Sequence, residues 1–133
     1  PYFIKPKDQE VFFLPGLYSV WENKWTWGML TEEANELMRN IHNSSDNPNR
    51  MTSILPLELS QEFVNNNLSE EKYREILKYA IPEENLYYHP VYPIRGGYRP
   101  DGKGKHEFFD YGNLPAVGTM NPDKGTDTKT LFD

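Results

Sequence analysis

Residues 1–31 have the pattern of β-structure. Two short apolar runs, Tyr2–Ile4 and Val11–Leu14, are separated by the polar, proline-containing segment 5–10, which predicts two strands joined as a hairpin. A Pro-Gly pair then predicts a break or bulge, after which residues 17–21 continue as extended chain. In residues 25–29 apolar side chains alternate with small or polar ones, the period of two that is typical of a strand.

The pattern changes to a helical period at residues 32–42. Thr31 is predicted to be the N-cap, because two glutamates follow it in the first turn, where the helix dipole favours negative charge. The apolar positions fall on one face of a helix and are Ala34, Leu37, Met38 and Ile41. The Asn, Ser and Pro residues of 43–48 end the helix, so His42 is expected in its last turn.

The rest of residues 1–94 alternates between the two periods. We expect a strand within 51–55, a helix over 57–66, a helix over 69–80 capped by Ser69, and an edge strand over 87–94. The fold class predicted is therefore α+β: an antiparallel β-sheet or barrel-like core with peripheral helices. Residues 95–133 are rich in Gly and Pro without a sustained period, and are expected to form a C-terminal extension. Arg99 in this extension is expected to lie in a solvated loop rather than to contact phosphates.

The amino-acid composition argues against several classes of function. The chain has 133 residues, which fits one domain, and a net charge of −6, which argues against a free-standing nucleic-acid binder. It contains no cysteine, so disulfides, thiolate metal sites and a cysteine nucleophile are excluded within it. No apolar run approaches the roughly 18 residues of a membrane span, and no association with a membrane is expected.

Three tryptophans lie close together in the chain, at positions 21, 25 and 27. Aromatic residues at strand spacing are usually buried, so we expect Trp21, Trp25 and Trp27 in the core. The alternative is a carbohydrate-binding module that presents them to sugar rings. The helical segment 57–80 counts against that alternative, because such modules are mostly all-β.

Histidine supplies the candidate chemistry. At a helix C-terminus the dipole stabilises an imidazolium, so His42 is either a proton-transfer group or a favourable cap. His89 is either a second site histidine or a structural residue beside a proline-bounded strand. Together with His106, these residues lack metal-ligand spacing, so neither a metal nor a cofactor is predicted.

The order LTEEANELM, IHN, RM and IL in residues 30–55 resembles the SRAP domain (SOS response-associated peptidase). The flanking segments PYFI, EVFFLPGLYSVW, WGMLT and HPVYPI extend the resemblance to residues 1–94. Two features depart from the family pattern. SSDNPN is inserted between Asn43 and Arg50, and Thr52 stands where proline is usual. The resemblance is to the C-terminal part of the domain only, which implies a missing N-terminal half as partner.

The resemblance implies a cytoplasmic protein that recognises abasic sites in single-stranded DNA. In the family, an N-terminal cysteine forms a thiazolidine crosslink with the ring-opened sugar, and this chain lacks that cysteine. By motif, His42 is implied as the proton-transfer residue and Arg50 as a DNA phosphate contact. Thr31 is implied as a polar residue of the site, ranked below His42 because a helix over residues 31–42 would span about 16 Å. The remaining alternative is that this chain is a fragment with no activity of its own.

Overall fold

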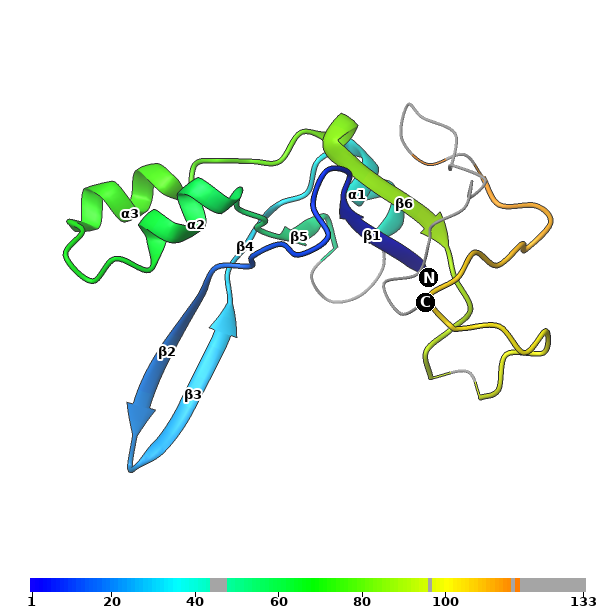
Figure 1. The fold of residues 1–133 in the computed structure, drawn as a ribbon, viewed down its shortest axis with the longest axis horizontal. Coiled ribbons are helices and arrows are strands. Elements are labelled where there is room, and N and C mark those ends of the chain that lie inside the picture. The colour runs from blue at the N-terminus through cyan, green and yellow to red at the C-terminus, as the bar shows by residue number, and fades with distance from the viewer. Residues whose placement is uncertain (44–47, 96, 116, 118–133) are drawn as a thin grey trace.

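The computed structural model describes residues 1–43, 48–95, 97–115 and 117, and it is α+β as predicted (Figure 1). The elements in chain order are β1 Tyr2–Pro6, β2 Gly16–Trp21, β3 Lys24–Met29, β4 Thr31–Glu33, α1 Glu36–Ile41, β5 Arg50–Thr52, α2 Leu57–Phe63, α3 Glu70–Ile76, the 3₁₀ turn η1 Glu83–Asn85, and β6 Leu86–Pro90. Three elements end earlier than expected: α2 ends at Phe63, α3 at Ile76 and β6 at Pro90.

In the described part of the chain the strands form three separate two-stranded antiparallel ladders, β1–β6, β2–β3 and β4–β5. The expected barrel-like sheet is therefore not present among the described residues. Each ladder is short. The β1–β6 and β4–β5 ladders contribute side chains to the core around Leu37 of α1, whereas every residue of β2 and β3 is exposed. Figure 1 shows β1, β6, α1 and β5 gathered at the centre of the molecule, with α2 and α3 at one end.

The first strand has a different partner from the one predicted. β1 pairs with β6 in a register that runs from Tyr2 opposite Pro90 to Pro6 opposite Leu86. The segment Val11–Leu14 is not a strand beside it, because only Phe13 forms an isolated bridge, with Leu55. The predicted hairpin between residues 2–4 and 11–14 was wrong, since β1 stays extended through Pro6 instead of turning there.

The predicted helix begins later than its sequence pattern indicated. Thr31 belongs to β4, which pairs with β5, so its assignment as N-cap was wrong. Asn35 caps α1 instead, because its side-chain oxygen accepts a hydrogen bond of 2.9 Å from the backbone N–H of Met38. The predicted apolar face is confirmed: Ala34, at the start of this turn, and Leu37 are 3 % and 0 % exposed.

The core lies where α1, β5 and β6 meet. Its buried members come from residues 34–88 and from one position after β6, and are Ala34, Leu37, Met51, Ile54, Ile81, Leu86, Tyr88 and Val117. Val117 belongs to the predicted extension, and its carbonyl oxygen accepts a hydrogen bond of 2.7 Å from the Tyr88 hydroxyl. The segment after β6 therefore packs against the centre of the fold at this point.

Arg99 organises the loops that follow β6. Its guanidinium donates to both carboxylate oxygens of Asp101, at 2.6 and 2.8 Å, and to the carbonyl oxygens of Gly104, Glu107 and Phe108. The expectation that Arg99 lies in a solvated loop was wrong, because the residue is only 4 % exposed. One buried cation with this many acceptors holds several turns of irregular chain together.

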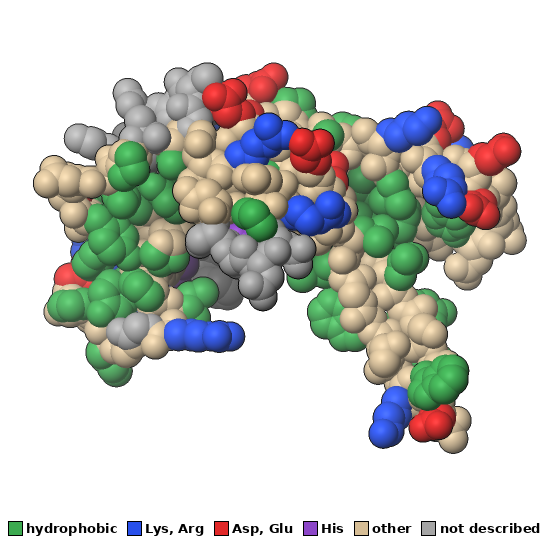
Figure 2. All heavy atoms as spheres, turned by 180° about the vertical axis from the view of Figure 1, so that it is seen from behind, with side chains coloured by type: hydrophobic (Ala, Val, Ile, Leu, Met, Phe, Trp, Pro, Cys, Tyr) green, Lys and Arg blue, Asp and Glu red, His purple; other side chains and the backbone are tan. Residues whose placement is uncertain are grey.

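The tryptophans are not in the core. Trp21, Trp25 and Trp27 are 73 %, 71 % and 76 % exposed, and all lie on or beside the β2–β3 hairpin. The hairpin projects from the body of the molecule, and its apolar side chains stand out on that arm in the space-filling view (Figures 1 and 2). The period-two pattern correctly indicated strands here, but the expected burial was wrong.

Candidate functional site

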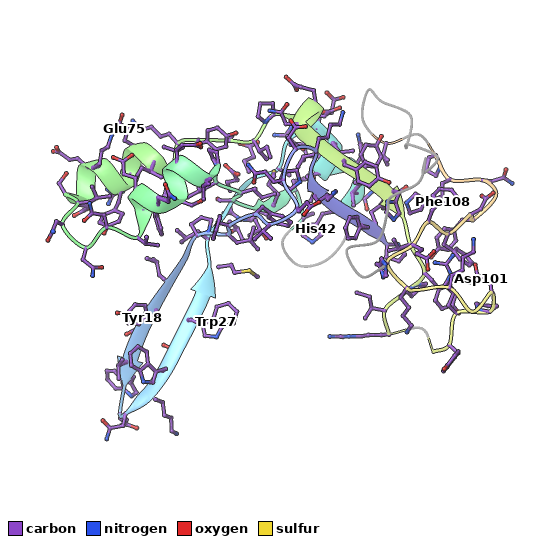
Figure 3. The ribbon with its side chains drawn as sticks, viewed as in Figure 1. Tyr18, Trp27, His42, Glu75, Asp101 and Phe108 are labelled. Carbon is purple, nitrogen blue, oxygen red and sulfur yellow. The ribbon has the colours of Figure 1, made fainter. Side chains whose placement is uncertain are left out.

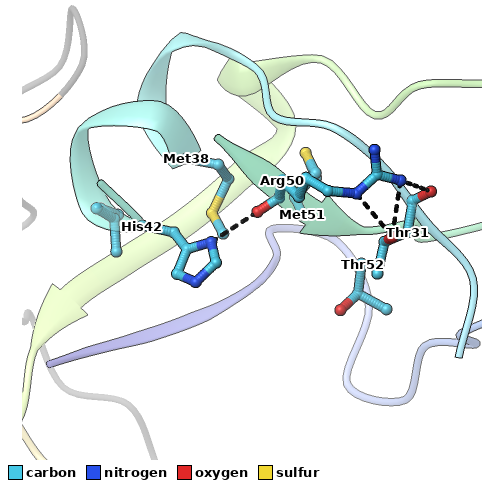
Figure 4. Close-up of a pocket in the computed structure, with 7 residues that line it drawn as sticks. Thr31, Met38, His42, Arg50, Met51 and Thr52 are labelled. Carbon is cyan, nitrogen blue, oxygen red and sulfur yellow. Dashed lines mark hydrogen bonds between the residues drawn. The ribbon is translucent and has the colours of Figure 1, made fainter. Parts of the chain in front are cut away.

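A pocket of about 720 Å³ lies where the end of α1 meets β4 and β5 (Figure 4). Its size falls within the roughly 300–1,000 Å³ of small-ligand sites. The lining combines thioether and aliphatic groups with hydroxyl, imidazole and guanidinium groups, and consists of Thr31, Met38, Ile41, His42, Arg50, Met51 and Thr52. Three short elements therefore bring Thr31, His42 and Arg50, which the family motif indicated for the site, into one pocket.

His42 is the C-cap of α1 and is held at both its backbone and its ring. Its backbone N–H donates to the carbonyl oxygen of Met38 at 2.7 Å. Its ring Nδ1 lies 2.9 Å from the carbonyl oxygen of Arg50. A carbonyl oxygen can only accept, so Nδ1 must carry the proton in that hydrogen bond. In the neutral ring Nε2 then has the lone pair, and the exposed side chain offers it as a base.

Arg50 is fixed by Thr31 across the β4–β5 ladder. Its Nε and Nη2 donate to the Thr31 hydroxyl at 3.0 and 2.8 Å, and Nη2 also donates to the Thr31 carbonyl oxygen at 2.6 Å. The residues are not directly opposite, since Thr31 pairs with Thr52 and Arg50 with Glu33. Among the described residues Nη1 of Arg50 has no hydrogen-bond partner, so one edge of the guanidinium stays available to a ligand.

The short helix explains how both ends of the motif reach one pocket. A helix over residues 31–42 would have held Thr31 and His42 far apart, but the chain forms β4 and a cap before α1 begins at Glu36. Thr31, His42 and Arg50 consequently line the same pocket. Their functional roles stay predictions. The sequence did not indicate Met38, Ile41 or Met51 as lining residues, because their apolar spacing indicated core alone.

The residues inserted before Arg50 leave this geometry intact because Asn49 closes the loop. The backbone N–H of Asn49 donates to the carbonyl oxygen of His42 at 3.1 Å, and its carbonyl oxygen accepts from the N–H of Ala34 at 2.9 Å. Asn49 has a φ of 63°, a left-handed conformation that Asn tolerates better than most residues. Residues 44–47 of the insertion lie outside the described residues.

His89 lies outside the pocket and is buried, with an exposure of 6 %. Its Nε2 lies 2.8 Å from the carbonyl oxygen of His106 and its Nδ1 lies 3.0 Å from the Tyr87 hydroxyl. The ring also stacks on Phe3, with 5.1 Å between ring centroids. These contacts join β1, β6 and the following loops. Of the two alternatives for His89, they favour a structural residue over a second histidine of the site.

Glu32, next to Thr31 in the chain, is an ionisable group that the sequence did not indicate for the site. It lies in β4 between Thr31 and Glu33, opposite Met51, and burial raises the pKa of its carboxyl group. Its Oε1 is buried without a hydrogen-bond partner among the described residues. Neighbouring residues of a strand point to opposite faces, so Glu32 faces away from the side of β4 on which Thr31 lies.

Two further properties bear on the kind of site. Within the described ranges, no group of three or more His, Cys, Asp or Glu side chains is placed to hold a metal ion. The same ranges contain no helix that is long and apolar enough to cross a bilayer.

The fold and pocket define a class: an α+β protein in which a capped helix end, a histidine ring and a β-strand arginine meet. The family model for SOS response associated peptidase (SRAP) matches residues 1–94, and the chain belongs to this family. The match extends through β6 and includes the whole pocket lining.

A solved crystal structure shows the same fold. It is of a protein from Bacteroides thetaiotaomicron, a structural-genomics target, with 24 % sequence identity and a TM-score of 0.61. The alignment covers 80 % of this chain but only 45 % of the Bacteroides chain, so this chain spans less than half of that protein. No curated protein sequence matches the chain.

Proposed function

We propose that this chain supplies the proton-transfer and phosphate-contacting part of an SRAP site that recognises abasic sites in single-stranded DNA and forms a protective crosslink there. The observation that supports the proposal most is the convergence of His42, Arg50 and Thr31 in one pocket within a chain that belongs to the family. On this proposal the protein is cytoplasmic and acts in the DNA-damage response, because its substrate is damaged chromosomal DNA.

The reaction would condense an aminothiol with the aldehyde of the ring-opened sugar. The amine adds to the aldehyde carbon to give a carbinolamine, the hydroxyl leaves as water, and the thiol adds to the resulting imine carbon. The products are a thiazolidine and one water, so no oxidant or other co-reactant is required. The two demanding steps are proton transfers, to the leaving hydroxyl and from the attacking groups.

His42 fits those proton transfers because its Nδ1–H is committed to the Arg50 carbonyl oxygen. Nε2 is then the only ring position that exchanges a proton with a ligand in the pocket. Because the same carbonyl belongs to Arg50, one hydrogen bond fixes both the tautomer of the histidine and the place of the arginine backbone. An exposed ring at the rim of a pocket also meets the requirement that an acid–base group reach the reacting atoms.

Arg50 fits the role of a phosphate contact. Thr31 holds Nε and Nη2, which fixes the plane of the guanidinium, and the remaining Nη1 edge can donate to a phosphate oxygen. Phosphate contacts of this kind position a strand without reading its sequence. That behaviour is what a protein needs if it recognises a lesion in any sequence context.

The nucleophile would come from polypeptide that this chain does not contain. The chain has no cysteine, so it cannot supply the thiol that the thiazolidine requires. We therefore propose that an N-terminal half of the domain, carrying the cysteine, completes the site. The Bacteroides structure supports the need for further polypeptide, because more than half of that chain lies outside the match.

A small aminothiol can replace the missing cysteine in a direct test. Single-stranded DNA with one abasic site is incubated with cysteamine, with and without the chain, and the DNA–cysteamine adduct is followed by mass. We expect the chain to accelerate adduct formation and His42→Ala to remove the acceleration. His106→Ala is the matched control, because His106 is an exposed histidine outside the pocket. Equal adduct rates with and without the wild-type chain would contradict the proposal.

The carbohydrate-binding alternative keeps one feature in its favour, since Trp21, Trp25 and Trp27 are exposed. Family membership and the helices α2 and α3 favour the SRAP assignment instead. The exposed aromatic side chains therefore need another explanation.

A further inference from the structure

The β2–β3 hairpin is a regular arm with one apolar face. Six residue pairs form its ladder, and the two turn residues, Glu22 and Asn23, have φ values of 46° and 63°. Positive φ at both positions is the mark of a type I′ turn, whose twist matches that of the strands. The arm is thus a preformed structure rather than an irregular loop.

Side chains alternate across this ladder, so its residues fall on two faces. One face, here called the aromatic face, consists of Tyr18, Val20, Trp25, Trp27 and Met29. Trp27 lies opposite Tyr18, and the Tyr18 and Trp25 rings are 5.3 Å apart between centroids. The other face is mixed and consists of Leu17, Ser19, Trp21, Lys24, Thr26 and Gly28. Figure 3 shows Tyr18 and Trp27 on the projecting arm.

The aromatic face is unusually apolar for a surface. Every one of its side chains is at least 50 % exposed, and the two tryptophans exceed 70 %. Aromatic side chains bury about 150–250 Å² each, so three of them already approach the largest apolar patch of a typical monomer, which is about 300–600 Å². A two-stranded hairpin is also only marginally stable by itself. Both facts indicate a surface that is covered in the working protein.

We infer that the aromatic face is the docking surface for the complementary part of the SRAP domain, the part that the Bacteroides structure has outside its match with this chain. The occupant would present an apolar β-sheet face of its own. The inference rests on the proposed function only in assuming that a complementary half exists, and it names the surface that receives it.

Charge distinguishes this occupant from nucleic acid. The aromatic face contains no lysine or arginine, and the cation of the ladder, Lys24, lies on the mixed face beside Glu22 of the turn. Binding of single strands combines base stacking with cations that follow the phosphates. A face with aromatic rings and no cation fits an apolar protein surface better. A second copy of this chain is the other occupant to test, and the coverage of 45 % favours the complementary half.

The tryptophans provide the probe, because all three in the chain lie on this arm. The chain is labelled with fluorotryptophan, so that fluorine NMR observes only its own tryptophans. The partner is the polypeptide translated from the codons upstream of Pro1, supplied as a separate unlabelled chain. We expect the Trp25 and Trp27 resonances to shift and lose solvent exposure as a one-to-one complex forms, with a smaller change at Trp21.

Two matched variants separate the faces. Trp27→Thr on the aromatic face should weaken the association about tenfold or more, as truncation of an interface aromatic does. Trp21→Thr, which removes the same side chain from the mixed face, should leave the affinity within about twofold. The two remaining tryptophan resonances of each variant show whether the arm is still folded. Equal losses from the two variants would overturn the inference.

Other outcomes identify a different occupant or none. Resonance shifts that grow with the concentration of the chain alone would assign the face to a second copy, and shifts on adding oligothymidylate would assign it to nucleic acid. Either result overturns the inference. An unchanged spectrum with the upstream polypeptide, or the absence of coding sequence upstream of Pro1, also overturns it.

Association is measured without DNA, so docking without any acceleration of the cysteamine reaction would contradict the proposed function alone. Acceleration without docking would contradict this inference alone.

Discussion

The ring Nδ1 of His42 donates a hydrogen bond to the backbone carbonyl oxygen of Arg50 across 2.9 Å. This contact joins the end of α1 to the first residue of β5, although an insertion separates the two residues in the chain. It fixes the histidine tautomer with Nε2 as the position for proton exchange. The arginine side chain lies at the same junction, so acid–base and phosphate-contacting groups share one anchor.

His42→Ala tests whether the histidine is a proton-transfer group or only a cap. In the completed domain we expect a loss of about 10²–10⁴-fold in the rate of crosslink formation or reversal. The fold should survive, because Ala34 and Leu37 provide the buried contacts of this helix. A capping role alone predicts a loss of stability of about 0.3–1 kcal/mol with unchanged chemistry. Melting temperature and crosslinking rate are measured on the same variant. An unchanged crosslinking rate would mean that His42 only caps the helix.

The chain alone should not attach stably to abasic single-stranded DNA. It has no thiol, and the secondary amine of Pro1 can form at most a reversible Schiff-type adduct. The measurement is a denaturing gel of the chain after incubation with an abasic oligonucleotide, with reduction by borohydride as the positive control for reversible adducts. A protein–DNA band that survives denaturation without reduction would contradict this prediction.

Arg50→Gln tests the phosphate contact. One phosphate contact to single-stranded DNA contributes about 0.7 to the slope of log affinity against log salt, so the slope should become shallower by about that amount. Arg74→Gln on α3 is the charge-matched control, because Arg74 pairs with Glu70 outside the pocket. Fluorescence anisotropy over a salt series gives both slopes. The same change in the two variants would indicate a general charge effect and would count against a specific contact.

Thr31 supplies a finer version of that test. Thr31→Val keeps the β-branched shape that suits β4 but removes the hydroxyl that accepts from Nε and Nη2 of Arg50. If this hydroxyl orients the guanidinium, the variant should weaken binding while leaving the salt slope unchanged. If the variant binds like the wild type, the hydroxyl is not needed, and the Thr31 carbonyl oxygen is the group that holds the guanidinium.

Local patterns in the sequence predicted the elements around the site, but not their partners. The buried face of α1 could be predicted because apolar residues recur with a helical period. The N-cap could not, because Thr31 and Asn35 are both acceptable caps and pairing between β4 and β5 decides between them. The partner of β1 lies far along the chain in β6, and nothing in the local pattern of either strand indicates the other.

Burial was hardest to predict for the hairpin. The alternation in residues 25–29 indicated a strand, but whether its apolar face is covered depends on a surface that the pattern does not include. Arg99 shows the converse, since a basic residue in a Gly-rich segment is buried by backbone carbonyl groups that have no signature in side-chain types. Both misassignments concern tertiary contacts rather than local conformation.

Asn49 should be sensitive to the loss of its left-handed backbone preference. Its φ of 63° costs most residues about 1–2 kcal/mol, so Asn49→Ala should lower the free energy of unfolding by about 1 kcal/mol. Asn49→Gly is the matched control and should be nearly neutral, because glycine adopts this conformation freely and the hydrogen bonds to His42 and Ala34 come from the backbone. Denaturant unfolding of both variants gives the comparison. Equal destabilisation would mean that the Asn side chain, not the backbone conformation, matters.

The pair Arg99–Asp101 predicts how stability depends on acid pH. The hydrogen bonds from Arg99 lower the pKa of the Asp101 carboxyl group below its ordinary value, so the folded state favours the ionised form. Its stabilising contribution is then present above the ordinary aspartate pKa and is lost as the pH falls through the lower pKa of the folded state.

Asp101→Asn should lower the melting temperature at neutral pH and make the melting temperature fall less steeply in acid. Asp110→Asn is the control, because Asp110 is an exposed aspartate of the same segment, and it should change neither property appreciably. Melting curves over an acid pH series test this, and curves for wild type and Asp101→Asn that stay parallel down to the most acidic point would contradict it.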